Sequence, residues 1–109
     1  MASRVVLRFY NREDPEKRVF MAELEGESLV IGRAKGCHLP LDDDDVSREH
    51  AQLDRVGGFW FVSDLESTNG VVVEGQRVRR AKLGHGSKFR VGDTVIEIRD
   101  RTAGLGRGR

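Results

Sequence analysis

The sequence predicts an all-β domain, either a β-sandwich or a β-barrel, and two observations favour that fold class. Short runs rich in Val, Ile, Leu and Phe are separated by Gly, Asp and Asn, while helical periodicity is almost absent. Several of these runs are joined by two-residue turns that are typical of hairpins, among them Gly57-Gly58 and Gly92-Asp93. The chain of 109 residues suffices for one hydrophobic core, so a single domain is expected.

The first half of the chain holds six runs with strand character. Gly26 breaks the second run, and Pro40 limits the fourth to a short edge piece. Gly57-Gly58 separates the fifth run from the sixth, with the spacing and composition of a tight hairpin. In chain order the runs are Val5–Tyr10, Arg18–Leu24, Leu29–Gly32, His38–Leu41, His50–Val56 and Phe59–Asp64.

The second half is expected to form two more hairpins, with turns at Glu74-Gly75 and Gly92-Asp93. Glutamate is unfavourable at the positive φ that a tight two-residue turn requires, and a bulged turn at Glu74 would relieve this strain. A sandwich presents its loops in clusters at its two ends, where a binding site would be built. The four runs are Val71–Val73, Gln76–Val78, Ser87–Val91 and Thr94–Arg99.

Residues 1–100 are expected to form the domain, and residues 101–109 a flexible Gly- and Arg-rich tail with little to pack. The apolar run at the start of the chain is far too short for a signal peptide or a transmembrane helix. The single cysteine, Cys37, cannot form an intramolecular disulfide, which favours a reducing compartment. The expected location is the cytoplasm, with the nucleus as the alternative in a eukaryote.

Charged residues make up 34% of the chain, but their signs nearly cancel, to a formal net charge of +1. Bulk attraction to nucleic acid is therefore not indicated. One basic cluster remains, but no aromatic residues are interleaved with it in the sequence, so nucleic-acid binding is only a weak second interpretation. The cluster consists of Arg77, Arg79, Arg80 and Lys82.

Three short polar motifs lie at the ends of predicted strands, where loops converge. They are Gly32-Arg33, Ser47-Arg48-Glu49-His50 and Ser67-Thr68-Asn69-Gly70. Together they supply guanidinium, hydroxyl and carboxamide groups, which suit binding of a phosphate and of the peptide backbone beside it. Each motif alone has an ordinary alternative. Arg33 would then pair with an acid of the Asp42–Asp45 loop, and Ser47 and Asn69 would belong to simple turns.

The pair Ser47 and His50 also raises a catalytic interpretation, which we reject. A nucleophilic serine needs a positioned base, an orienting acid and an oxyanion hole, and the sequence has no G-x-S-x-G elbow. His50 is instead expected to bond to the loop backbone and hold the recognition loops, and the chain is expected not to be an enzyme. No zinc-ligand or EF-hand spacing occurs, so neither a metal nor another cofactor is expected.

The order and spacing of the motifs, followed by Gly75 and Gly92-Asp93 in a β-rich chain, resemble the forkhead-associated (FHA) domain. The resemblance covers roughly Val19 to Ile98. It implies a β-sandwich of two twisted, mainly antiparallel sheets with about eleven strands. It also implies that loops at one end of the sandwich bind phosphothreonine peptides.

The resemblance also implies roles for individual residues. By the family pattern Arg33, Ser47 and Thr68 would contact the phosphate. Arg48 would assist, partly through its backbone, and Asn69 would hold the peptide main chain.

Three further residues, Gly32, His50 and Gly70, would support the loops. Asp45 precedes the motif residue Ser47 by two positions, and in the family that position lies near the third peptide residue after the phosphothreonine. An acidic residue there should favour Lys or Arg in the peptide.

The expected function is phosphothreonine-dependent binding in Ser/Thr kinase signalling. The expected partner is a phosphothreonine-containing protein, either a Ser/Thr kinase or one of its substrates, and neither a membrane nor nucleic acid. The alternative is a phospho-independent interaction or scaffold module with the same fold.

Overall fold

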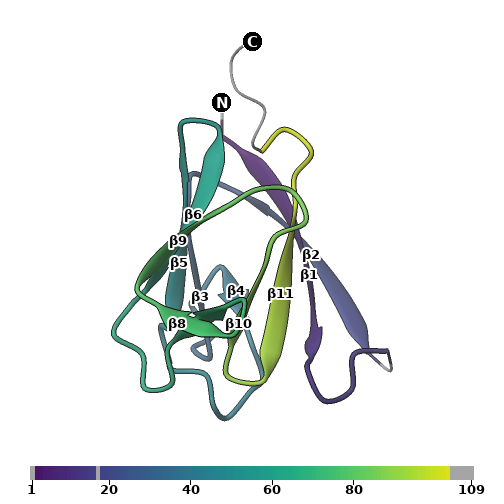
Figure 1. Ribbon diagram of the computed structural model, residues 1–109, viewed down its shortest axis with the longest axis vertical. Coiled ribbons are helices and arrows are strands. Elements are labelled where there is room, and N and C mark those ends of the chain that lie inside the picture. The colour runs from purple at the N-terminus through teal and green to yellow at the C-terminus, as the bar shows by residue number, and fades with distance from the viewer. Residues whose placement is uncertain (1, 17, 104–109) are drawn as a thin grey trace.

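The computed structural model describes residues 2–16 and 18–103 as eleven strands in two packed sheets (Figure 1). Those ranges contain no helix, and so none that could cross a membrane. One sheet has the strand order β2-β1-β11-β10-β7-β8 and the other the order β4-β3-β5-β6-β9. Antiparallel pairs predominate, and β3 pairs with β4 in parallel. The predicted all-β sandwich is confirmed.

The strands are short, and most of them lie where the hydrophobic pattern places them. Their bounds are β1 (Arg4–Asn11), β2 (Val19–Glu25), β3 (Ser28–Gly32), β4 (Leu39–Pro40), β5 (Ala51–Val56), β6 (Phe59–Asp64), β7 (Val71–Val73), β8 (Gln76–Val78), β9 (Arg80–Leu83), β10 (Lys88–Val91) and β11 (Thr94–Arg99).

The core lies between the two sheets and is formed by alternate residues of their strands. Leu7 in β1 and Ile96 in β11 are fully buried from one sheet, and Leu53 in β5 and Trp60 in β6 are fully buried from the other. Burial of a large apolar side chain stabilises a fold by roughly 1.5–3 kcal/mol. The same alternation turns polar residues outward, which explains why so charged a chain still builds one core.

A buried polar network joins the two sheets at the end of β11. Trp60 Nε1 donates a hydrogen bond of 2.8 Å to Asp100 Oδ2, and Arg55 forms an ion pair of 2.5 Å with the same oxygen. Thr102 Oγ1 donates to the other carboxylate oxygen at 2.6 Å. Burial raises the pKa of Asp100, but the hydrogen bonds from Thr102 and Trp60 and the charge of Arg55 together hold it below its ordinary value.

The expected domain boundary at residue 100 falls within a turn that packs against the sandwich. Ala103 N donates to Asp100 O at 2.9 Å, and Ala103 is only 7% exposed. The first three residues of the expected tail, 101–103, are therefore held by the domain. The other residues of that tail, 104–109, lie outside the described residues.

Strand β9 was not predicted, and its residues Arg80 and Lys82 were assigned only to the basic cluster. Its pairing with β6 places Arg80 over the Phe61 ring, at 4.6 Å from the ring centroid, and Lys82 over the Phe59 ring at 4.3 Å. Aromatic and basic residues therefore alternate in space although they do not in the sequence. Each such cation–π contact contributes about 0.5–1 kcal/mol, so these cations help to attach β9 to the sheet.

The hairpin expected with its turn at Glu74-Gly75 is confirmed, and its turn contains no bulge. Val73 pairs directly with Gln76, so the connection between β7 and β8 is a two-residue turn. Glu74 has a φ of 51° and Gly75 a φ of 79°, the left-handed conformation at both turn positions. The right-handed twist of the two strands matches this turn type, and this match outweighs the cost at Glu74.

Replacing Glu74 with glycine should raise the free energy of unfolding by about 1 kcal/mol, because glycine adopts positive φ without a Cβ clash. Urea denaturation of Glu74→Gly and the parent chain measures the difference. Glu74→Ala is the matched control and should change stability little, because alanine keeps the Cβ. A glycine variant that is less stable than the parent would contradict the left-handed turn.

Candidate functional site

Three loops meet at the end of the sandwich opposite the start of β1 and the end of β11 (Figure 1). They follow β3, connect β4 to β5, and connect β6 to β7. One open pocket lies among them, and it brings together all five predicted peptide-contacting residues and Asp45. Its lining consists of Arg33, Asp44, Asp45, Val46, Ser47, Arg48, Glu49, Thr68 and Asn69.

His50 lies behind this pocket, is fully buried, and forms hydrogen bonds with the three segments that surround the pocket. Its Nδ1 accepts a hydrogen bond from Ser47 N at 3.0 Å, so the ring proton is on Nε2, which donates to Gly70 O at 2.7 Å. Its backbone N–H donates to Ile31 O, and its carbonyl accepts from Leu65 N. One residue thus connects β3, the β4–β5 loop and the β6–β7 loop. The ring contacts the amide of Ser47 and not its hydroxyl.

Ser47 faces the pocket with a hydroxyl group that is held from behind. Ser47 Oγ accepts a hydrogen bond of 3.0 Å from Thr68 N, which leaves the hydroxyl hydrogen to donate outward. The exposed Thr68 side chain lies on the same pocket wall. The main-chain N–H of Thr68 is occupied by this bond, so it does not serve as a further donor to a ligand.

Asn69 connects the β6–β7 loop to the acidic loop. Its Nδ2 donates to Asp45 O at 2.9 Å, which uses one of the two amide hydrogens. The second amide hydrogen and the carbonyl oxygen of this exposed side chain remain for a bound ligand. A carboxamide with one donor and one acceptor can bind the backbone of an extended peptide.

Arg33 is exposed and is oriented by main-chain contacts. Its Nε donates to Val46 O at 3.0 Å, and its backbone N–H donates to Ser47 O at 3.0 Å. Neither Arg33 nor Arg48 forms an ion pair with any residue in the described part of the chain. The terminal nitrogens of both arginines are therefore available to an anion.

The need for glycine at position 32 comes from close packing. Its φ is outside the left-handed region, so the turn itself does not require glycine. A Cβ there would overlap the carbonyl oxygen of Arg48 and lie 2.8 Å from its carbonyl carbon and 3.0 Å from Cys37 Sγ. That oxygen also accepts from Ala34 N at 3.1 Å and from Cys37 Sγ at 3.2 Å.

Sequence reasoning assigned no role to Ser67 or Asp64, and both support the site. Ser67 is buried, and its Oγ accepts from Gly70 N at 2.8 Å and donates to Asp64 Oδ1 at 2.5 Å. Asp64 Oδ1 also accepts from Ser67 N at 3.1 Å. The signal was the Ser-x-x-Gly spacing, in which a serine hydroxyl binds an amide three residues later.

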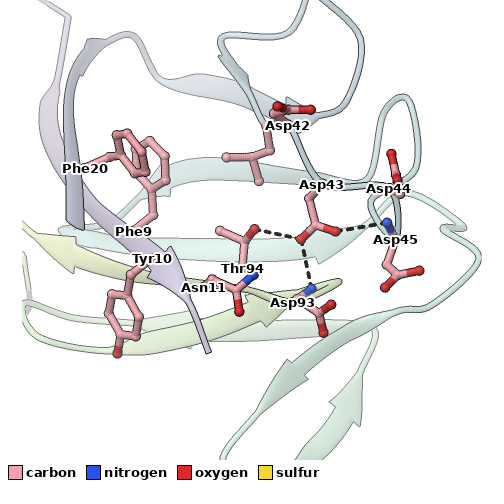
Figure 2. Close-up of a pocket in the computed structure, with 11 residues that line it drawn as sticks. Phe9, Tyr10, Asn11, Phe20, Asp42, Asp43, Asp44, Asp45, Asp93 and Thr94 are labelled. Atoms are coloured by element: carbon pink, nitrogen blue, oxygen red, sulfur yellow. Dashed lines mark hydrogen bonds between the residues drawn. The ribbon is translucent and has the colours of Figure 1, made fainter. Parts of the chain in front are cut away.

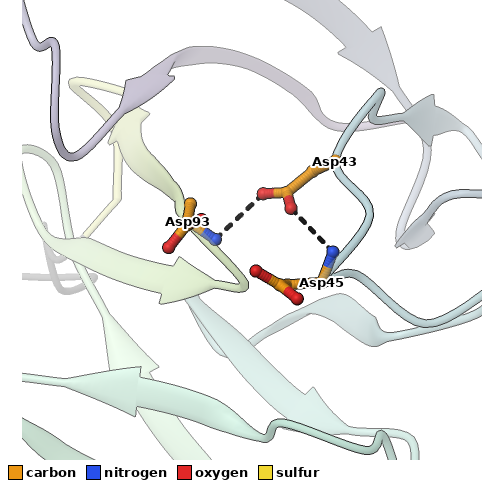
Figure 3. A group of neighbouring side chains, drawn as sticks. All are labelled: Asp43, Asp45 and Asp93. Carbon is orange, nitrogen blue, oxygen red and sulfur yellow. Dashed lines mark hydrogen bonds between the residues drawn. The ribbon is translucent and has the colours of Figure 1, made fainter.

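Asp43 attaches the acidic loop to the turn between β10 and β11 (Figures 2 and 3). Its carboxylate accepts from Asp45 N at 2.9 Å, from Asp93 N at 2.9 Å and from Thr94 Oγ1 at 2.8 Å. The carboxylates of Asp43, Asp45 and Asp93 lie within 4.8 Å of one another. Because the Asp43 carboxylate already accepts from three protein donors, we interpret the three carboxylates as part of a structural contact between the acidic loop and the β10–β11 turn.

A model of the FHA domain family matches residues 29–92, which is more than half of the chain. The chain belongs to the FHA domain family. The match contains the whole loop cluster, from Gly32-Arg33 to Ser67-Thr68-Asn69-Gly70.

The relatives of this FHA domain include mycobacterial proteins. It is 43% identical over 77 residues to the FHA domain-containing protein FhaB of Mycolicibacterium smegmatis, a match that covers 70% of the chain and 50% of FhaB. It is 34% identical over 77 residues to FhaA of Mycobacterium tuberculosis, which covers 71% of the chain and 15% of FhaA. The chain therefore spans about half the length of FhaB and a smaller part of FhaA.

Solved FHA structures superpose on nearly the whole sandwich. One, from a structural and functional analysis of phosphothreonine-dependent FHA domain interactions, has a TM-score of 0.73 at 31% identity and covers 90% of this chain and 97% of the other. Another is Mycobacterium tuberculosis EmbR in complex with a low-affinity phosphopeptide. Its TM-score is 0.70 at 28% identity, over 86% of this chain and 24% of EmbR.

Replacing Gly32 with alanine should destabilise the domain by about 2 kcal/mol or more, because the added Cβ must push the Arg48 carbonyl out of the loop. Gly36→Ala is the matched control, since a Cβ at Gly36 would have no atom within 4 Å. Urea denaturation of both variants measures the effect. Equal stability of the two would contradict the close approach described at Gly32.

Proposed function

We propose that this FHA domain binds phosphothreonine-containing segments of partner proteins through the loop cluster. The observation that carries the proposal is the pocket that Arg33, Ser47 and Thr68 line together. Both Arg33 and Arg48 lack an ion-pair partner in the described part of the chain. Guanidinium groups that form no ion pair, beside hydroxyl donors, are the arrangement expected for a phosphate.

The phosphate docks on the guanidinium of Arg33 and accepts hydrogen bonds from the hydroxyls of Ser47 and Thr68. Each charge-assisted hydrogen bond contributes roughly 1.5–3 kcal/mol. Arg48 adds charge and its main-chain N–H, which donates to no residue that the structure describes. Because His50 and Ser67 already hold the loops, little ordering cost is added on binding.

The peptide beside the phosphothreonine lies in extended form across Asn69, which contacts its backbone. In this proposal Gly32, His50 and Gly70 take no part in the contact and position the loops that do. The solved relatives support it, since one belongs to a study of phosphothreonine-dependent interactions and EmbR holds a phosphopeptide.

The proposed biological role is Ser/Thr kinase signalling, with a phosphorylated kinase or kinase substrate as the partner, in the cytoplasm. The domain acts by reversible binding and not by catalysis. In the site, the nitrogens of His50 are directed at backbone groups of Ser47 and Gly70, so the ring has no free nitrogen to act as a base on the Ser47 hydroxyl.

A phospho-independent interaction is the second candidate, and the surface of β2 favours it. Val19, Phe20 and Met21 are 40%, 48% and 61% exposed on this edge strand, where backbone groups are open to another chain. Binding of a natural partner that survives phosphatase treatment would favour this candidate over the loop site.

Arg33→Ala should weaken binding of a phosphothreonine peptide at least tenfold without loss of the fold, because it removes the best-placed guanidinium. Isothermal titration calorimetry measures the affinity, and the unphosphorylated peptide sets the baseline. Arg4→Ala is the control, an exposed arginine on β1 whose 3.7 Å ion pair with Glu23 is also exposed. Unchanged affinity in Arg33→Ala would remove the proposed central role of Arg33.

The exposed Asp45 should select peptides by charge, with Lys preferred over Ala and Ala over Asp at the third position after the phosphothreonine. Titrations of three peptides that differ only at that position measure the order, and Asp45→Asn should compress it while keeping the side-chain size. The three peptides binding the parent domain with equal affinity would contradict a selective role for Asp45.

A further inference from the structure

Arg77 lies on the outer face of β8, opposite Val72, and its side chain reaches back over the binding loop. A Cβ built on Gly70 would overlap Arg77 Nε and lie 2.8 Å from both its Cδ and its Cζ. The guanidinium therefore rests directly on the main chain of Gly70. Because consecutive Cα atoms are about 3.8 Å apart, it lies within about 8 Å of the Cα of Asn69.

The charge of Arg77 is not neutralised by any residue that the structure describes. The residue is exposed, and its side chain makes no ion pair or hydrogen bond with the residues that the structure describes. A guanidinium offers a planar fork of donors that matches the two oxygens of a carboxylate. It is thus free to bind an acidic side chain brought to it.

The main chain on which Arg77 packs, at Gly70, belongs to the β6–β7 loop of the binding site. Gly70 N donates to Ser67 Oγ at 2.8 Å, and Gly70 O accepts from His50 Nε2 at 2.7 Å, so both backbone groups of Gly70 are held. Thr68, two residues earlier, bonds to Ser47 in the pocket. Arg77 is thereby positioned by the same loop that supplies Thr68 and Asn69.

The Asp44–Asp45 flank of the pocket is acidic. Asp44 and Asp45 line both the phosphate pocket and a neighbouring pocket against Phe9 and Phe20, at the β1–β2 side (Figure 2). In the six-stranded sheet β2 is one edge strand and β8, which carries Arg77, is the other. A peptide that crosses the pocket and extends past Asn69 to Gly70 would meet negative charge at Asp44–Asp45 and positive charge at Arg77.

We propose that Arg77 is a specificity-determining residue that receives an Asp or Glu side chain of the bound peptide, on the side of the phosphothreonine away from the Asp44–Asp45 flank. The inference rests on the proposed phosphothreonine binding and adds a preferred charge polarity to it. The contact is solvent-exposed, so its effect is moderate and screened by salt.

The test is a double-mutant cycle between the domain and a peptide. The probe is a synthetic phosphothreonine peptide with alanine on both sides, in which each flanking position is replaced in turn by Glu or by Gln. Fluorescence anisotropy gives the Glu-to-Gln affinity ratio for the parent domain, for Arg77→Ala and Arg77→Lys, and for Arg79→Ala as the matched exposed control.

In the parent domain, Glu should bind about three- to fivefold more tightly than Gln at a position on one side only, and less so at high salt. Arg77→Ala should abolish this ratio, Arg77→Lys should keep part of it, and Arg79→Ala should leave it unchanged. A role of Arg77 in merely covering Gly70 would change all affinities together and leave the ratio as it was.

Two failures are distinguishable. Equal Glu-to-Gln ratios in the parent and in Arg77→Ala at every position, with binding still dependent on phosphothreonine, would overturn the role of Arg77 alone. Equal binding of phosphorylated and unphosphorylated peptides would overturn the proposed function, and the role of Arg77 with it.

Discussion

The buried imidazole of His50 is the constraint on which the binding end depends. Its two ring nitrogens bond to Ser47 in the β4–β5 loop and Gly70 in the β6–β7 loop, and the backbone groups of His50 bond to Ile31 at the end of β3 and to Leu65. An unpaired polar group at this depth would cost about 1–3 kcal/mol, so the loops are held in the one arrangement that satisfies the ring. A protonated ring would present a donor to the amide of Ser47, which is itself a donor, and this arrangement would be lost.

Close backbone packing completes the site, and two glycines make it possible. Gly32 lets the Arg48 carbonyl approach β3, and Gly70 leaves room for the side chain of Arg77. Because main-chain and buried polar groups satisfy one another behind the pocket, the charged and hydroxyl side chains in front remain free to meet a ligand. This is preorganisation in a literal sense, since binding need not form the loops first.

Charge in this domain is segregated in a way that the net value conceals. A formal net charge of +1 contains an acidic loop at residues 42–45 and a basic group on β8 and β9. Asp43 fixes the acidic loop against the β10–β11 turn, and two of the basic residues lie over phenyl rings of β6. In the tertiary structure Asp44 and Asp45 line the pocket, and Arg77 packs against Gly70 in the loop that supplies Thr68 and Asn69.

The sequence by itself determined the fold class, most of the strands and the set of residues around the pocket. Alternating apolar residues and glycine turns such as Gly57-Gly58 are local signals, and the family motifs carry the grouping of Arg33, Ser47 and Thr68. Only the tertiary structure decided features that depend on a distant neighbour. Strand β9 is held by contacts with Phe59 and Phe61, and strand twist imposes the left-handed turn on Glu74.

The same reason explains a contact beside the site that local patterns did not reveal. Arg77 and Gly70 are seven residues apart in the chain, and their contact exists because the two-residue turn at Glu74-Gly75 fixes the register of β7 and β8. A shift of one residue would turn every side chain of β8 to the other face. Register, close approach and burial arise from the packed whole, and a linear pattern of residue types does not contain them.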